Sequence, residues 1–163
     1  MAIDNRWDDK VRLLLINGPN LNLLGSREPG IYGATTYDSL VSELYSHAKK
    51  SGAMLDCFQS NHEGRIIDCL HNADKAFDAV ILNPGALTHY SYALRDAIQS
   101  ISIPVLEVHI SNIYNRESFR QISVTAPACI GQITGLGTLG YFLAIDYFVH
   151  MLTKGNTTMG VFD

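Results

Sequence analysis

The chain has 163 residues, of which 47% are hydrophobic and 17% are charged, with a formal net charge of −4 at pH 7. This composition is typical of one soluble globular domain with a substantial core, and the negative charge without a basic stripe argues against a nucleic-acid partner. The three cysteines lack metal-ligand spacing, so buried free thiols are expected rather than a metal site.

Residues 1–10 carry three aspartates and no apolar segment. They match neither a signal peptide nor a transit peptide, so we expect a frayed leader and a cytoplasmic protein. Residues 11–152 are expected to form a single domain, followed by a tail over residues 153–163. The most apolar segment, residues 139–152, is too short to span a membrane.

Strand-like and helix-like segments alternate along the chain. Helices are expected to begin at Thr36 and Thr88, with a third after the capping-box pattern of residues 60–63. A short helix is expected over residues 116–120, and a longer apolar helix closes the chain. Short apolar runs predict five strands, over residues 11–16, 53–58, 79–82, 104–109 and 128–133.

Regular alternation with short loops predicts an α/β fold in which helices cover both faces of a parallel sheet. For five strands the natural choice is the flavodoxin-like order 2-1-3-4-5, a three-layer sandwich. That order places a ligand beyond the carboxyl ends of strands one and three. Polar segments follow those strands at residues 17–22 and 83–89, and strand four ends in the polar residues 107–112.

Glu107 and His109 are two positions apart on one predicted strand, so they share a face and the carboxylate can reach the imidazole. A carboxylate that fixes one ring nitrogen leaves the other free to pass a proton. The alternative is a structural histidine at a strand end. At this edge of the sheet we favour the acid–base pair.

Other polar residues keep two interpretations. His89, near a predicted helix start, can bind an anion or hydroxyl group, or be an ordinary neighbour of the helix cap. Arg116 and Arg120 suit a carboxylate ligand, an ion-pair network or a solvated basic face. The apolar neighbours Phe119 and Ile122 favour a binding role for Arg120.

Two glycine-rich segments also need interpretation. Residues 25–33 place glycines and a proline around a short charged stretch, which suits either a lid over a site or a solvated connection. Residues 135–140 match the G-x-G-x-x-G pattern, but the chain ends after the following helix. A dinucleotide site needs a further strand with an acidic residue, so close helix–sheet packing explains these glycines better.

Seven ordered segments together resemble type II 3-dehydroquinate dehydratases. The resemblance extends from Val11 to about Leu152, in the family's order and spacing. Two residues depart from the family pattern, Tyr90 in place of a small residue and Gln121 in place of a common histidine. The matching segments are residues 16–33, Gln59-Ser60-Asn61-His62-Glu63-Gly64, residues 83–89, Ala93-Leu94-Arg95-Asp96-Ala97, residues 107–112, residues 116–120 and Gly135-Leu136-Gly137.

The resemblance implies a flavodoxin-like fold and the reversible dehydration of 3-dehydroquinate, with no metal or organic cofactor. In that family's pattern Tyr32 is the base, and Arg27 lowers the Tyr32 pKa. Asn20 holds a water that stabilises the enolate oxygen. His109 protonates the departing hydroxyl and is oriented by Glu107.

The same resemblance implies how the anionic substrate is held. The backbone N–H groups of Ile110 and Ser111 bind its carboxylate. Asp96 reaches the site of a neighbouring subunit, because the family assembles as trimers grouped into dodecamers. With Leu94, Ala97 and Ile98 on the inner helix face, Asp96 is also expected to point away from its own core. The ring hydroxyls are bound by Asn83, His89 and Arg120.

Two other functions are alternatives to the one that this resemblance implies. A flavin-binding electron carrier of the same fold needs a Ser/Thr-rich phosphate loop after strand one, whereas this chain has Asn17-Gly18-Pro19-Asn20 there. An inactive scaffolding relative would have lost the catalytic residues, which are intact here. The sequence leaves open whether the reaction serves shikimate synthesis or quinate breakdown.

Overall fold

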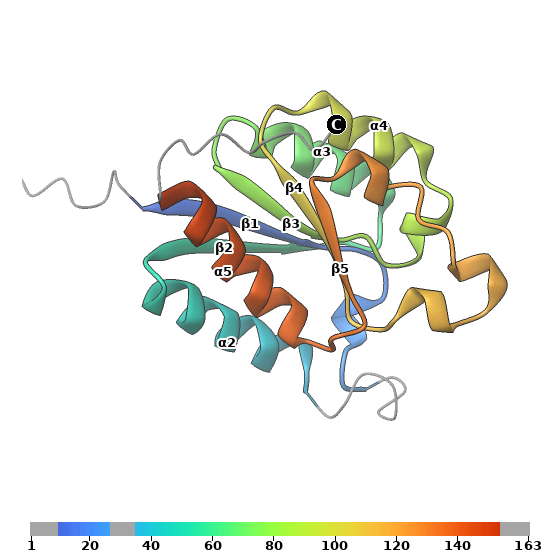
Figure 1. Cartoon of the computed structure of the whole chain (residues 1–163), viewed down its shortest axis with the longest axis horizontal. Helices are drawn as coiled ribbons and strands as arrows, with labels where there is room; N and C mark the ends of the chain where they lie inside the picture. Colours follow the sequence, from blue (N-terminus) through green and yellow to red (C-terminus); the bar gives the residue numbers. More distant parts are fainter. Residues whose placement is uncertain (1–9, 27–34, 154–163) are drawn as a thin grey trace, which may run out of the picture.

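The computed structural model describes residues 10–26 and 35–153. Its parallel sheet has the order β2-β1-β3-β4-β5, which confirms the predicted flavodoxin-like topology (Figure 1). The predicted leader and tail, except Lys10 and Thr153, lie outside the described residues. The strands are β1 (Val11–Asn17), β2 (Ala53–Gln59), β3 (Ala79–Asn83), β4 (Val105–His109) and β5 (Gly131–Thr134).

Helices cover both faces of the sheet and enclose two apolar cores. On one face α2 (Tyr37–Lys50) and α5 (Leu139–Thr153) pack against alternate residues such as Leu13 and Leu15. On the other face α3 (Glu63–Ala73) and α4 (Tyr92–Ser100) pack against the remaining strand residues, such as Leu14 and Ile16. Because successive side chains of a strand point to opposite faces, and both faces are covered, the interior strand β1 is apolar nearly throughout.

The predicted start of α2 is confirmed, because the Thr36 hydroxyl accepts a hydrogen bond from the Ser39 backbone N–H at 3.2 Å. The other two predicted starts are wrong. Residues 60–63 form no capping box: α3 begins at Glu63 after His62, which makes no side-chain cap. The Ser60 hydroxyl instead accepts the His62 N–H at 3.0 Å.

Helix α4 begins at Tyr92 rather than beside Thr88. Its cap is Ser91, whose hydroxyl accepts the Leu94 N–H at 2.9 Å. Thr88 lies in a 3-10 turn, η2 (Gly85–His89), where its buried hydroxyl contacts Glu107. Thr88 and Ser91 are both residue types that can cap a helix. Ser91 is the cap here because the Thr88 hydroxyl is already bonded to the buried carboxylate of Glu107.

The chain between β4 and β5 also differs from prediction. Instead of one helix over residues 116–120, it forms two 3-10 turns, η3 (Ile113–Asn115) and η4 (Ser118–Arg120), with Arg116 extended between them. Strand β5 begins at Gly131, opposite Leu106, because residues 126–128 form a further 3-10 turn, η5, that contains Pro127. Proline has no N–H to donate to a sheet ladder.

The glycines of residues 135–140 have two different roles. A Cβ on Gly140 would lie 3.2 Å from side-chain atoms of Ile133 and Val108, which confirms close helix–sheet packing. Gly135 and Gly137 instead adopt positive φ values of 85° and 62°. The cysteines are free but only partly buried, and burial raises the pKa of Cys57 to about 11. Among the described residues, no helix is long and apolar enough to cross a membrane.

Candidate active site

A cavity of about 200 Å³ lies beyond the carboxyl ends of β1, β3 and β4, at the edge where the strand order predicts a ligand. Its walls combine apolar side chains with a few polar ones, as small-molecule sites commonly do. The polar residues of this lining are Asn20, Asn83, His89, His109, Ser111, Arg116 and Arg120.

The floor of the cavity joins the loops that follow β1 and β3. The Gly18 backbone N–H donates to the Asn83 carbonyl at 2.7 Å, and a Cβ on Gly18 would lie 2.5 Å from the Pro84 oxygen. Asn20 adopts a left-handed conformation, with φ of 68°. Its N–H donates to Asn61 Oδ1 at 2.9 Å. Gly18 is therefore needed for its missing side chain, and Asn20 for its tolerance of the left-handed conformation.

Asn83 is held from the opposite side by a residue that the sequence analysis missed. Its Nδ2 donates to the hydroxyl of the buried Tyr141 at 2.6 Å, and that hydroxyl donates to Asn17 Oδ1 at 2.8 Å. Asn83 Oδ1 accepts the Gly85 N–H at 3.1 Å. The sequence did contain a signal for this contact, a tyrosine within a strongly apolar helix. A buried phenol usually requires a polar partner, so a hydrogen bond to another buried residue could have been expected.

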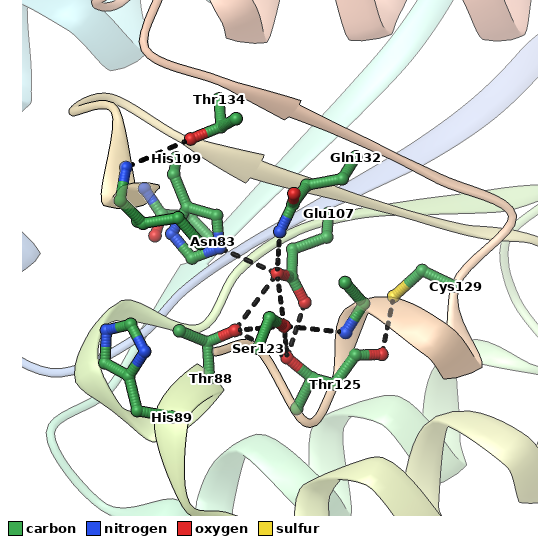
Figure 2. A network of polar contacts seen from close by, with 12 residues as sticks. Asn83, Thr88, His89, Glu107, His109, Ser123, Thr125, Cys129, Gln132 and Thr134 are labelled. Carbon is green, nitrogen blue, oxygen red and sulfur yellow. Dashed lines mark hydrogen bonds and ion pairs between the residues drawn. The ribbon is translucent and has the colours of Figure 1, made fainter. Parts of the chain in front are cut away.

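The predicted contact between Glu107 and His109 is present, with Glu107 Oε1 2.7 Å from His109 Nε2 (Figure 2). Glu107 is fully buried and His109 is 5% exposed. A carboxylate can only accept, so Nε2 carries a proton. Nδ1, which has no hydrogen-bond partner among the described residues, is therefore the nitrogen available to a cavity ligand.

Glu107 has further donors that sequence reasoning did not find. Burial alone would raise the pKa of Glu107, but the hydrogen bond and charge of His109 hold it below its ordinary value, with help from Thr125 and Gln132. The donors other than His109 come from three separate parts of the chain, and no sequence spacing links them to Glu107. They are Thr88, Ser123, Thr125 and Gln132.

The chain after His109 turns sharply and presents backbone donors to the cavity. The Gly135 N–H binds the His109 carbonyl at 3.2 Å, and the Gly137 N–H binds the Ile110 carbonyl at 3.0 Å. The N–H groups of Ile110 and Ser111 have no acceptor within the described part of the chain, and both residues line the cavity. Unpaired N–H groups of this kind suit an anionic ligand.

His89, Arg116 and Arg120 form the remaining polar wall. His89 ends η2, and its Nδ1 donates to the Ile122 carbonyl at 2.8 Å, which leaves Nε2 for a ligand. Glu117 pairs with Arg120 Nε at 3.1 Å and with Arg116 Nε at 3.6 Å. Of the alternatives for these two arginines, the ion pairs are present, and both arginines also line the cavity.

Of the predicted site residues that the structure describes, Glu107 and Asp96 do not line this cavity, although Glu107 contacts His109, which does. Asp96 is exposed on α4 and does not line the cavity, in agreement with its predicted outward direction. Arg27 and Tyr32 lie outside the described residues. Within residues 10–26 and 35–153, no group of three or more histidine, cysteine or acidic side chains could hold a metal ion.

The sheet order and the cavity beside the buried Glu107–His109 pair define the class, a flavodoxin-like α/β protein with a small-molecule site at the switch point. The family model described as dehydroquinase class II matches residues 11–149, and the chain belongs to this family. A 3-dehydroquinate dehydratase of Bacillus mycoides is 62% identical over 88% of the chain and 98% of the relative.

Two solved structures agree with this assignment. A type II dehydroquinase from Butyrivibrio crossotus is 52% identical and superposes with a TM-score of 0.83, over 88% of this chain and 97% of that one. One from Propionibacterium acnes is 40% identical, with a TM-score of 0.84 over 87% and 99% of the two chains.

Proposed function

We propose that this chain catalyses the reversible dehydration of 3-dehydroquinate to 3-dehydroshikimate. The observation that carries the proposal is the buried Glu107–His109 pair at the cavity, within a chain 62% identical to a 3-dehydroquinate dehydratase. The reaction serves the shikimate pathway or quinate breakdown, in the cytoplasm, and needs no metal or organic cofactor.

His109 acts as the acid. Glu107, 2.7 Å from Nε2, stabilises positive charge on the ring, and Nδ1 then donates its proton to the departing hydroxyl. The carbon–oxygen bond breaks as that proton is transferred, and the hydroxyl leaves as water. The carboxylate does not take part in bond making, so its role is to orient and stabilise the imidazolium.

Tyr32 acts as the base that removes a proton from the carbon next to the ketone, which gives an anti elimination through an enolate. A free phenol is mostly protonated near neutral pH, since its ordinary pKa is about 10. Arg27 makes Tyr32 a stronger acid by stabilising the phenolate. Asn20, in its left-handed conformation at the cavity wall, holds the water that stabilises the enolate oxygen. After release of water, Tyr32 returns its proton to His109 through solvent.

Local donors hold the substrate against the protein's net charge of −4. The N–H groups of Ile110 and Ser111 bind the substrate carboxylate, in the manner of an anion nest. Asn83, His89 and Arg120 bind the ring hydroxyls. Their shared place in one cavity supports this assignment.

Assembly completes the site. Asp96 is exposed on its own chain, so a role in catalysis requires a neighbouring subunit. We propose that the chain forms trimers grouped into a dodecamer, in which Asp96 reaches the cavity of its neighbour.

The function is tested by adding 3-dehydroquinate and following the absorbance of the conjugated enone product, with and without borohydride. We expect product in both cases, because no lysine Schiff base is involved. Absence of the enone would refute the proposal. A purified protein that is yellow and inactive would instead support the flavin-binding alternative.

A further inference from the structure

Glu107 is surrounded by more donors than a carboxylate that only orients a histidine requires (Figure 2). Oε2 accepts the hydroxyl of Thr125 at 2.5 Å. The donors around Oε1 are His109 Nε2 at 2.7 Å, Gln132 Nε2 at 2.8 Å, Thr88 Oγ1 at 3.0 Å and Ser123 Oγ at 3.1 Å.

The three hydroxyls of this cluster also contact one another. Thr88 Oγ1 lies 2.7 Å from Ser123 Oγ and 2.8 Å from Thr125 Oγ1, and the last two are 3.3 Å apart. A hydroxyl has one proton and can accept as well as donate, so each proton can point at the carboxylate or at another hydroxyl. Donation to Glu107 can therefore change without movement of any heavy atom.

Two of the donors, Ser123 and Gln132, are held in place by further hydrogen bonds. The Ala126 backbone N–H donates to Ser123 Oγ at 2.9 Å, and the Tyr114 hydroxyl donates to Gln132 Oε1 at 2.9 Å. Gln132 is thereby oriented with its amide N–H toward Glu107. Donors within hydrogen-bond distance of both carboxylate oxygens favour the charged form of Glu107 over the neutral form.

We propose that Thr88, Ser123, Thr125 and Gln132 are positioning residues that keep Glu107 anionic while His109 transfers a proton. This inference rests on the proposed function of His109. In the transfer the Nδ1–H bond breaks and the proton joins the departing hydroxyl as water, while the Nε2–H bond stays intact. With fewer donors, Glu107 would draw the Nε2 proton to itself and leave a neutral, weaker acid.

The pair is shielded from most other titrating groups. Cys129 is nearby, where burial and the Glu107 charge raise the pKa of its thiol, and its Sγ donates to the Thr125 carbonyl at 3.5 Å. Of the titratable and charged side chains in the described part of the chain, only His109 contacts Glu107 directly. The others around the pair are Tyr114 behind Gln132, Arg95 at the Val124 carbonyl, and His89, Arg116 and Arg120 along the cavity.

The test removes one hydrogen-bond donor to Glu107 and keeps the shape of the side chain that carried it. Thr125→Val should lower kcat about 10- to 100-fold, the effect of losing one hydrogen bond to a charged group, with KM within about twofold. The pH below which activity falls should move upward, since Glu107 then protonates more readily. Thr125→Ser should restore both properties. If Thr125→Val does not fold, Gln132→Met at a half-buried position replaces it, with the same expected loss of kcat and the same upward shift of the pH profile.

Infrared titration without substrate gives a readout that does not depend on turnover. On acidification, the carboxylic acid band of Glu107 should appear at higher pH in Thr125→Val than in the unmodified protein, and adding Glu107→Gln should remove it. Thr153→Val, which loses a hydroxyl bonded within α5, is the matched control and should change nothing. An unmoved band and an unmoved pH profile in Thr125→Val would overturn the inference. A moved band in a protein that never dehydrates 3-dehydroquinate would instead refute the proposed function.

Discussion

The hydroxyl of Tyr141 joins Asn83, at the cavity, to α5 on one face of the sheet: it lies 2.6 Å from Asn83 Nδ2 and 2.8 Å from Asn17 Oδ1. The amide of Asn83 is thereby held in one orientation, with Nδ2 toward the phenol and Oδ1 toward the Gly85 N–H. Tyr141 is 1% exposed, and burial raises the pKa of its phenol, so it remains a neutral partner.

Tyr141→Phe should therefore affect stability and binding together. The change leaves buried amide groups of Asn17 and Asn83 without partners, which should cost about 1–3 kcal/mol in the free energy of unfolding. KM should rise more than kcat falls, because the proposed role of Asn83 is to bind a ring hydroxyl and not to transfer a proton. Urea unfolding and steady-state kinetics measure both effects. Tyr92→Phe, at an exposed position, is the control. Equal stability in the two variants would show that the Tyr141 hydroxyl does not stabilise Asn17 and Asn83.

His109→Ala should lower kcat at least about 100-fold while KM stays within about threefold, since a proton donor acts mainly in the transition state. Glu107→Gln should cause a smaller loss, because it removes the orienting charge and keeps the shape. Stopped-flow and steady-state assays of enone formation measure these values. A kcat near that of the unmodified protein in His109→Ala would exclude His109 as the acid.

The depressed pKa of Glu107 has a consequence for acid stability. Its carboxylate stabilises the folded protein above the unfolded pKa of about 4.3, and that contribution is lost as pH falls through the lower folded pKa. The difference in unfolding free energy between the unmodified protein and Glu107→Gln should thus shrink as pH falls below about 4.3. Urea titrations at a series of pH values test this, and a constant difference would contradict it.

Substitutions of Arg27 and Tyr32 test the proposed proton removal by Tyr32. Tyr32→Phe should still bind substrate but nearly abolish turnover. Arg27→Ala should move the rise of kcat with pH to higher pH, because the phenolate loses a stabilising charge. Arg27→Lys is not conservative if the planar guanidinium contacts the phenolate. An unchanged pH profile in Arg27→Ala would show that another group activates Tyr32.

Asp96 tests the role of assembly. Light scattering after size-exclusion chromatography should give a mass near twelve chains, and Asp96→Ala should lower activity although its side chain is exposed on its own subunit. Asp68→Ala on α3 is a suitable control, since it removes a carboxylate from another helix. A stable and fully active monomer would rule out a shared site.

The topology and the contact between Glu107 and His109 could be predicted because both depend on local periodicity. Alternating apolar runs set the layers, and the two-residue spacing of Glu107 and His109 puts them on one face. Thr88 shows where local pattern fails: it resembles a helix cap, yet a long-range bond to Glu107 fixes it. Tyr141, Thr125 and Gln132 act across many residues of separation, which no spacing reveals.

The interlocked turns after β1 and β3 limit how this cavity can vary. Gly18 has no room for a side chain beside Pro84, and a Cβ on Gly85 would lie 3.1 Å from the Pro19 oxygen. A side chain at either glycine would press on the backbone of the other turn, so a substitution at Gly18 or Gly85 should displace both turns. Changes to the shape of the cavity should therefore begin at lining residues outside these two turns, such as Ile113 and Arg116.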